Sequence, residues 1–230
     1  MNLFFSNEII SGTAILNEEE SGHCIRVLRM KAGDEIFFTD GSGNFYTGKI
    51  EDADPKKCTI RIFETKNQSG KRKYSLHIAI APTKNIDRFE WFLEKSTEIG
   101  IDEITPVICH RSERREVKPD RLKKVILSAM KQSLKTYLPV LHPAIPFEKF
   151  VAANYDGQKF VCSMEGELHL KNNLQKNSSI ILIGPEGDFT GTELLLAKDH
   201  RYSCVSLGES RLRTETAGIV ACTVVSLLHP

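Results

Sequence analysis

Two glycine-bearing loops near the C-terminus carry the residues best suited to bind a ligand and act on it. Residues 184–187 read Gly-Pro-Glu-Gly, in which the proline fixes one φ and Gly187 is free to take a positive φ. The second loop begins at Leu207 and Gly208 and leads to Arg213 and Glu215. An acidic loop shaped by glycine and proline suits a cationic or uncharged ligand better than a pyrophosphate. An ordinary tight turn before a helix is the alternative interpretation.

The elements around these loops are two successive strand–loop–helix units. An apolar run short enough to be a buried parallel strand precedes each loop, at residues 180–183 and 204–207. A capping box of Thr190 and Glu193 predicts the start of the first helix, and the second helix begins near Thr214. We expect two adjacent strand ends to form a crevice for a small ligand, because glycine lets the backbone approach it closely.

The sequence lacks the motifs of several other classes of catalytic and binding site. Neither G-x-G-x-x-G nor G-x-x-x-x-G-K-[ST] occurs, so a dinucleotide or a nucleoside triphosphate is disfavoured. The seven histidines are dispersed, which predicts no metal site, and no G-x-S-x-G elbow is present for a nucleophilic triad. The six cysteines lack C-x-x-C spacing, which indicates reduced thiols in the cytoplasm rather than disulfides or a zinc site.

Length and charge limit the class of protein. The 230 residues permit one large or two modest domains. With 31 Lys+Arg against 30 Asp+Glu the net charge is almost zero, so any nucleic acid would have to bind to a local basic patch. No apolar stretch approaches membrane-spanning length, and the first 12 residues lack the features of a signal peptide. We therefore expect a soluble, unexported protein.

Two domains are predicted, at residues 1–70 and 74–230, separated by a polar, basic linker. The first domain is β-rich, with strands at 35–39, 44–51 and 58–65 and a short helix at 21–30. In the second, strands at 74–81, 103–110 and 159–164 alternate with helices at 86–99 and 119–137, and a connection follows that includes residues 147–153. This alternation predicts an α/β fold with a mostly parallel sheet covered on both faces.

Basic residues are concentrated between His110 and Lys135. Nine bases and three acids give this segment a charge of 9 − 3 = +6. Such a surplus in a nearly neutral chain indicates a phosphate-binding face, and a solvated helix surface is the competing interpretation. The same two interpretations apply to the basic residues of the short N-terminal helix. The candidate RNA-binding residues are Arg26, Arg29, Lys31, Arg111, Arg114 and Arg115.

Two long motifs occur in order in the last quarter of the chain. They are Ile183-Gly-Pro-Glu-Gly187 and Leu212-Arg-Thr-Glu-Thr-Ala217, with Leu207-Gly208 between them. Shorter motifs precede them: His23-x-x-x-Val-Leu-Arg29 with Gly33-Asp34, Lys95-x-Thr-Glu-x-Gly100, and Gln132-Ser133. Together these motifs resemble the RsmE family, SPOUT-class methyltransferases that methylate N3 of one uridine in 16S rRNA.

The resemblance implies S-adenosyl-L-methionine as the methyl donor and 16S rRNA, within the small ribosomal subunit, as the partner. It implies a PUA-like β-barrel over residues 1–70 that holds RNA, and a SPOUT domain over residues 74–230 with a trefoil knot. It also implies a homodimer in the cytoplasm, with no membrane and no metal. A related SPOUT enzyme acting on a ribose 2′-OH or a tRNA base, and a non-catalytic RNA-binding protein, remain alternatives.

The resemblance also implies the residues of the site. The cofactor would contact Met164, Ile183, Gly184, Glu186, Gly187, Leu207, Gly208, Leu212 and Thr214. Because the uridine imide attacks as its anion, a nearby cation would stabilise it, and Arg213 (or Arg211) is the catalytic candidate. A carboxylate base, Glu215 or Glu186, is the rival, and a structural pairing of Arg213 with Glu215 is the alternative without a catalytic role.

Three departures from the family pattern bear on this site. Asp188 stands where the family usually has a second glycine, which adds charge and restricts φ beside the pocket. Ser210-Arg211 replaces the usual Arg-Ile before Leu212. Lys131 and Lys135 stand where Glu and Arg are common.

Overall fold

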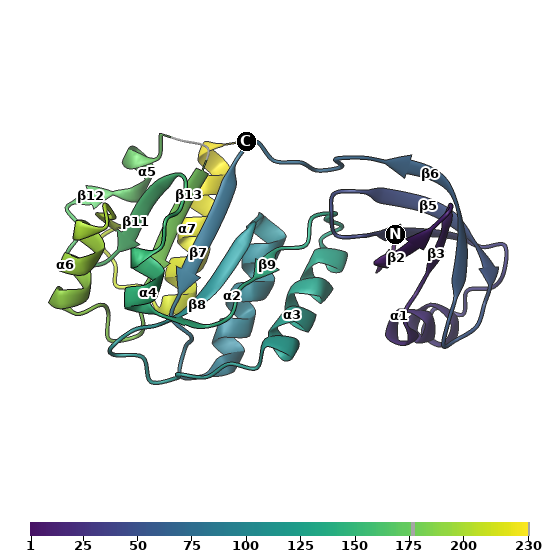
Figure 1. Ribbon diagram of the computed structural model, residues 1–230, viewed down its shortest axis with the longest axis horizontal. Helices are drawn as coiled ribbons and strands as arrows, with labels where there is room; N and C mark the ends of the chain where they lie inside the picture. The colour runs from purple at the N-terminus through teal and green to yellow at the C-terminus, as the bar shows by residue number, and fades with distance from the viewer. Residues whose placement is uncertain (176–177, 230) are drawn as a thin grey trace. The chain divides into compact units, whose positions relative to one another are not determined.

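Residues 1–175 and 178–229 are described by a computed structural model, and they divide into two units (Figure 1). The first unit comprises Met1–Lys71 with Met130–Leu138, and the second comprises Arg72–Ala129 with Pro139–Pro230. Residues 130–138, predicted in the second domain, pack with the first unit.

The first unit contains a six-stranded sheet. Its strands are β1 Leu3–Phe5, β2 Glu8–Ile10, β3 Thr13–Ile15, β4 Glu35–Thr39, β5 Phe45–Asp52 and β6 Thr59–Lys66, in the order β1-β4-β5-β6-β3-β2. Only the β1–β4 pair is parallel. The strands predicted at 35–39, 44–51 and 58–65 are confirmed as β4, β5 and β6. The first three strands were missed because three residues are too few to show an alternating pattern.

A short helix closes over this sheet. Helix α1, Glu18–Gly22, is capped by Asn17, whose side chain accepts a hydrogen bond from the Glu20 amide at 2.9 Å, and a π-helix, His23–Val27, follows it. The helical segment therefore starts three residues before the predicted Ser21, because the cap lies at Asn17. The core between sheet and helix consists of Phe4, Ala14, Leu16, Cys24, Ile36, Phe38, Tyr46, Ile50, Cys58 and Ile60.

The second unit contains an eight-stranded parallel sheet, which confirms the predicted α/β class. Its strands are β7 Ser75–Ile80, β8 Glu103–Ile108, β9 Val140–Leu141, β10 Ile145–Pro146, β11 Gln158–Cys162, β12 Leu168–His169, β13 Ser178–Ile183 and β14 Ser203–Ser206. The order is β10-β8-β7-β13-β11-β14-β12, and β9 also pairs with β8. The helices are α2 Ile86–Ile99, α3 Pro119–Gln132, α4 Phe147–Ala152, α5 Leu170–Asn173, α6 Gly191–Asp199 and α7 Thr214–Leu228.

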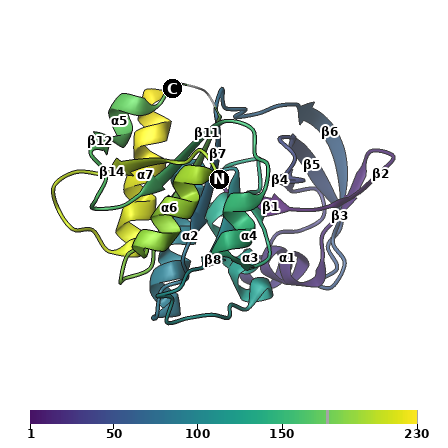
Figure 2. The same cartoon turned by 60° about the vertical axis from the view of Figure 1, so that its left-hand side comes forward.

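Helices cover both faces of this sheet, as Figures 1 and 2 show. On one face Phe150 of α4 and Ala197 of α6 pack in a core with Ile180 and Leu182 of β13. On the other face α7 packs against α2 so closely that a Cβ added at Gly218 would lie 2.6 Å from the Phe92 ring. Glycine at this position therefore sets the spacing between the two helices, because any larger side chain would displace a buried aromatic ring.

The strands that carry the two glycine loops are not adjacent, contrary to the prediction. Strand β11 pairs in parallel with β13 on one side and with β14 on the other. Strands consecutive in sequence are usually neighbours in a sheet, and that regularity led to the wrong expectation. The consequence is that three strand ends, not two, converge where the loops meet.

Two helix boundaries also differ from the prediction. Helix α3 ends at Gln132 rather than at Tyr137, and Leu134 has a positive φ of 55°. Beyond it the Thr136 carbonyl accepts hydrogen bonds from the Gly43 amide at 2.8 Å and from the Thr39 hydroxyl at 3.2 Å, so partners in the first unit interrupt the helix. Residues 147–152, expected in a connection, form α4 directly after Pro146. No helix within the described residues is long and apolar enough to cross a membrane.

Candidate active site

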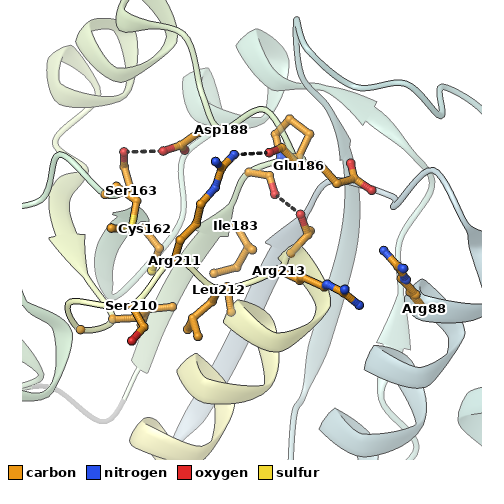
Figure 3. Close-up of a pocket in the computed structure, with 17 residues that line it drawn as sticks. Arg88, Cys162, Ser163, Ile183, Glu186, Asp188, Ser210, Arg211, Leu212 and Arg213 are labelled. Atoms are coloured by element: carbon orange, nitrogen blue, oxygen red, sulfur yellow. Dashed lines mark hydrogen bonds between the residues drawn. The ribbon is translucent and has the colours of Figure 1, made fainter.

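A cavity of about 340 Å³ lies where the segments after β11, β13 and β14 meet (Figure 3). Its lining residues are Arg88, Cys162, Ser163, Met164, Ile183, Gly184, Pro185, Glu186, Asp188, Leu207, Gly208, Ser210, Arg211, Leu212, Arg213, Thr214 and Ala217. Aliphatic side chains and loop backbone line it together. A cavity of this size and mixed lining is typical of sites for small organic ligands and cofactors.

The first loop depends on glycine for close packing rather than for an unusual backbone. A Cβ at Gly184 would lie 3.1 Å from the Phe189 ring, and one at Gly187 would lie 3.2 Å from Cδ of Arg111. Gly187 is free to take a positive φ but does not, and the positive φ falls on Asp188, at 59°. The chain turns at this later residue, where the Asp188 amide donates to the Pro185 carbonyl at 2.9 Å.

Hydrogen bonds hold Asp188 in its left-handed conformation. One carboxylate oxygen accepts from the Phe189 amide at 2.7 Å, and the other accepts from the Ser163 hydroxyl at 3.0 Å. Aspartate tolerates this region better than most residues because its short side chain can bond to nearby backbone groups. The carboxylate thus ties the first loop to the end of β11.

Substitutions at Asp188 separate these two contributions. Asp188→Ala keeps the strained φ and loses both hydrogen bonds, so we expect it to lower the free energy of unfolding by about 2 kcal/mol. Asp188→Gly loses the same bonds but removes the strain, so we expect a loss about 1 kcal/mol smaller. Urea denaturation of the two variants measures this difference, and equal losses would contradict the assigned role of φ.

The second loop is joined to the first by two hydrogen bonds. The Thr214 hydroxyl donates to the Gly184 carbonyl at 3.0 Å, and the Arg211 guanidinium donates to the Glu186 carbonyl at 3.3 Å. The Glu186 carboxylate itself accepts from the Lys84 amide at 2.9 Å. Gly208 has a φ of 129°, a conformation that side-chain-bearing residues rarely adopt. The loops therefore form one connected wall of the cavity.

Two further arginines, Arg213 and Arg88, line the cavity, and unlike Arg211 they donate no side-chain hydrogen bond to the carbonyls of either loop within the described chain. Arg213, immediately before α7, is exposed and lines the cavity, and its guanidinium has no hydrogen-bond or ion-pair partner among residues 1–175 and 178–229. Arg88, in the first turn of α2, lies 3.9 Å from Oε1 of Glu215, whose side chain is only 9% exposed. Figure 3 shows Arg213 extending from the start of α7 toward the side on which Arg88 lies. Their charges favour anionic groups at this end of the cavity.

The sulfur at the end of β11 is not set up as a nucleophile. Burial raises the pKa of the Cys162 thiol well above its usual value, with smaller contributions from Cys204 and Asp188. Only the thiolate attacks, so this side chain serves as a polarisable part of the wall. The cavity can therefore orient a ligand and stabilise negative charge, and these are the requirements of a group transfer that needs no covalent enzyme intermediate.

Most residues predicted for the site line this cavity. They are Met164, Ile183, Gly184, Glu186, Leu207, Gly208, Leu212, Arg213 and Thr214. Gly187 and Glu215 were predicted with them but are not lining residues. Gly187 faces Arg111, and Glu215 lies behind the cavity beside Arg88. In the structure Glu215 therefore contacts Arg88, and no pairing with Arg213 is found among the described residues.

The candidate RNA-binding arginines of the second unit brace loops. Arg111 donates to the Gly187 carbonyl at 2.7 Å, Arg114 donates to the Thr83 carbonyl at 3.0 Å, and Arg115 donates to the His110 carbonyl at 3.1 Å. Their contacts fix the loops beside the cavity. The other three candidates, Arg26, Arg29 and Lys31, are exposed in the first unit, and Arg29 has a φ of 57°.

Sequence reasoning missed Arg88, Cys162 and Ser163. Cys162 ends β11 and Ser163 follows it, directly before Met164, so the predicted strand end could have indicated both. No sequence pattern indicated Arg88, because a basic residue in the first turn of a helix is usually interpreted as a solvated charge. Only the packing of α2 against α7 brings Arg88 to the cavity.

Comparisons with known proteins agree with this geometry. The model of an RNA methyltransferase domain matches residues 70–226, and that of an RNA methyltransferase PUA domain matches residues 16–63. The ribosomal RNA small subunit methyltransferase E of Rickettsia conorii is 30% identical over 207 residues, which cover 88% of this chain and 84% of that protein.

Solved structures extend the likeness to the whole fold. A probable rRNA-methyltransferase from Porphyromonas gingivalis has a TM-score of 0.92 and 40% identity, covering 100% of this chain and 98% of that one. Ribosomal RNA small subunit methyltransferase E from Neisseria gonorrhoeae, bound to S-adenosyl methionine, has a TM-score of 0.90 and 25% identity, covering 99% and 98%. The chain thus belongs to the RsmE family of RNA methyltransferases, as its motifs at residues 183–187 and 212–217 indicated.

Proposed function

We propose that the protein methylates N3 of a specific uridine in the 16S rRNA of the small ribosomal subunit, with S-adenosyl-L-methionine as the donor. The observation that carries this proposal is the cavity at three converging strand ends, which has arginines at one end and a Cys162 thiol that burial keeps protonated. Such a site suits transfer to an acceptor that reacts as an anion. Family membership supports the substrate class.

The cavity fits the donor in size and in chemical character. Ile183, Leu207 and Leu212 provide apolar surface for a planar base, and the Glu186 and Asp188 carboxylates favour the positive end of the molecule. Arg88 or Arg211 can receive a carboxylate. When bound, the donor supplies a methyl group attached to a sulfonium sulfur. Transfer of that methyl group releases a neutral thioether and needs neither a metal nor a covalent enzyme intermediate.

The chain's own residues must position the acceptor and stabilise its charge. Arg213 lies at the cavity, and its guanidinium has no intramolecular partner in the described chain, so it is available to a uracil that has lost its N3 proton. Arg211 is less available, because it donates to the Glu186 carbonyl. Glu215 contacts Arg88 and does not line the cavity, which favours a positioning role for this carboxylate over that of the base.

The remaining residues and elements take roles outside the chemistry. Residues 1–70 would be an RNA-binding PUA-like domain that uses Arg26, Arg29 and Lys31, and residues 74–230 the methyltransferase domain. The exposed groups of Arg111, Arg114 and Arg115 would contact phosphates while bracing the loops. A cytoplasmic homodimer acting on the small subunit, without a metal in the chemistry, completes the proposal.

A trefoil knot in the methyltransferase domain is part of the same proposal. After β14, on one side of β11, the chain returns through residues 207–213 to α7, which packs on α2 and on β7 at the other side. The loop after β11 lies directly over β14, since a Cβ at Gly166 would be 2.3 Å from the Val205 carbonyl carbon. Such a crossing is what threading of a loop requires.

Methylation assays with defined RNAs test the proposed function. Purified protein and labelled donor are incubated with undermethylated small-subunit particles, free 16S rRNA and bulk tRNA, and digested nucleosides are identified by mass. We expect 3-methyluridine in 16S rRNA. A 2′-O-methylated nucleoside or a labelled tRNA would show that the protein is a SPOUT methyltransferase with a different substrate. Binding of the donor without any methylated product would favour the non-catalytic alternative.

A further inference from the structure

We propose that His77, Glu103 and His142 form a binding site for a divalent transition-metal ion of the zinc class. Each residue offers one ligand atom, and these atoms all lie within 4.8 Å of one another. Two imidazole nitrogens and one carboxylate oxygen are a ligand set that zinc commonly takes in proteins, with one position left for water.

The topology of the sheet places these three side chains together. His77 of β7 and Glu103 of β8 are register partners in neighbouring parallel strands, so their side chains lie on the same face. His142 directly follows β9, which pairs with β8, and its amide donates to the Ile104 carbonyl at 2.9 Å. No metal site was predicted from the sequence because these residues are far apart in the chain, with Glu103 and His142 separated by 39 positions.

This cluster is separate from the proposed methyl-transfer site. It lies near the beginning of β7 and β8, whereas the cavity lies at the ends of β11, β13 and β14 in the same parallel sheet. None of its members lines the cavity. The proposed ion therefore has a structural role, in which it holds the segment after β9 to strands β7 and β8.

The contacts of the cluster suit metal binding. Nε2 of His142 lies 2.7 Å from a Glu103 carboxylate oxygen, and Nε2 of His77 lies 2.8 Å from the Thr105 hydroxyl. The His77 ring packs edge-on against Phe150 and Tyr155, with centroids 5.4 and 5.6 Å away, so its orientation is fixed. An ion about 2.0–2.2 Å from each ligand would require movements of about 1 Å, which the two outer side chains can make.

Solvent access differs within the set in a way that permits metal entry. His77 is buried, whereas the side chains of His142 and Glu103 are 37% and 41% exposed. A hydrated ion can therefore meet the two outer ligands first and exchange a water for the inner imidazole. The competing interpretation is a plain hydrogen bond between His142 and Glu103 that holds no ion, and the experiment distinguishes the two.

Titration of chelator-treated, full-length protein with Co²⁺ tests the site. We expect saturation at one equivalent, with the visible absorption of a four-coordinate nitrogen–oxygen site that Zn²⁺ displaces. His142→Ala and Glu103→Gln should each lower Co²⁺ affinity at least about tenfold. His110→Ala is the matched control, since its exposed side chain lies outside the cluster, and it should leave the affinity unchanged.

The partial exposure of both substituted side chains makes loss of folding a weak objection, and circular dichroism of each variant checks it. Absence of saturable binding by the wild-type protein, or Co²⁺ affinity in both variants equal to that of the wild type, would overturn the proposal in favour of a metal-free hydrogen bond. Neither readout uses RNA or S-adenosyl-L-methionine, so the result is independent of the proposed methylation.

Discussion

Replacement of Arg213 by alanine is expected to lower the rate of methyl transfer by about 10²–10³-fold. The guanidinium lies at the cavity with no partner among the described residues, so its charge can interact with the ligand and does not stabilise the fold through an ion pair. Loss of a preorganised positive group from a site where negative charge develops removes transition-state stabilisation more than ground-state binding. Single-turnover assays on the preferred RNA substrate measure the rate.

Binding of the donor separates catalysis from assembly of the pocket in this variant. Arg213 contributes no hydrogen bond to either loop in the described chain, so calorimetry should give a donor affinity within about threefold of the wild type. A parallel loss of affinity and rate would assign Arg213 to donor binding. An unchanged rate would remove it from the mechanism.

Arg211→Ala is the matched control for Arg213→Ala. Both arginines line the cavity from the same loop, but Arg211 donates to the Glu186 carbonyl and thereby links the two loops. Its loss should weaken donor binding more than it slows the chemical step. If Arg211→Ala instead gave the large fall in rate at normal affinity, the two arginines would exchange roles.

Features encoded by a local pattern could be predicted from the sequence. Helix α2 has its predicted bounds, Ile86 to Ile99, because Asn85 caps one end and Gly100, with a φ of 131°, ends the other. The capping box of α6 is present as predicted, since Thr190 and Glu193 satisfy each other's hydrogen bonds within one turn. These interactions span only a few residues, so neighbouring side chains determine them.

Features that depend on strand order could not be predicted. The sequence has no local signal that β11 lies between β13 and β14, because the three strands are short, with 5, 6 and 4 residues, and pair only with strands distant in the chain. The same holds for Arg88, which reaches the cavity from a helix more than 70 residues before either loop. Glycine was correctly singled out in both loops, but its physical role in the first, close packing against Phe189 and Arg111, is a tertiary property.

The first unit depends on a comparable long-range contact, between Glu20 of α1 and Lys131 at the end of α3. The Glu20 side chain is only 5% exposed, and one of its oxygens accepts from the Phe5 amide at 3.1 Å. Its other oxygen accepts a hydrogen bond from the Lys131 ammonium. This ion pair fastens residues 130–138 to the β-rich unit, and it gives a physical role to a lysine that departs from the family pattern.

We expect Lys131→Met to lower the free energy of unfolding by about 3 kcal/mol, because it leaves the buried Glu20 carboxylate without its counter-charge. Lys123→Met on the same helix is the control, since its side chain is exposed, and it should change stability by less than about 0.5 kcal/mol. Urea denaturation measures both variants. A loss below about 1 kcal/mol for Lys131→Met would show that water or another base replaces the lysine.

A second substitution determines whether charge or packing is responsible for that loss. Glu20→Gln in the Lys131→Met background removes the uncompensated charge, while the amide oxygen still accepts from the Phe5 amide. Replacing a buried ion pair by neutral groups of similar size is far less costly than breaking it, so the double variant should be more stable than Lys131→Met alone by more than about 1 kcal/mol. If the double variant were less stable instead, the lysine stem would contribute through packing, and the attachment of residues 130–138 would not depend on charge.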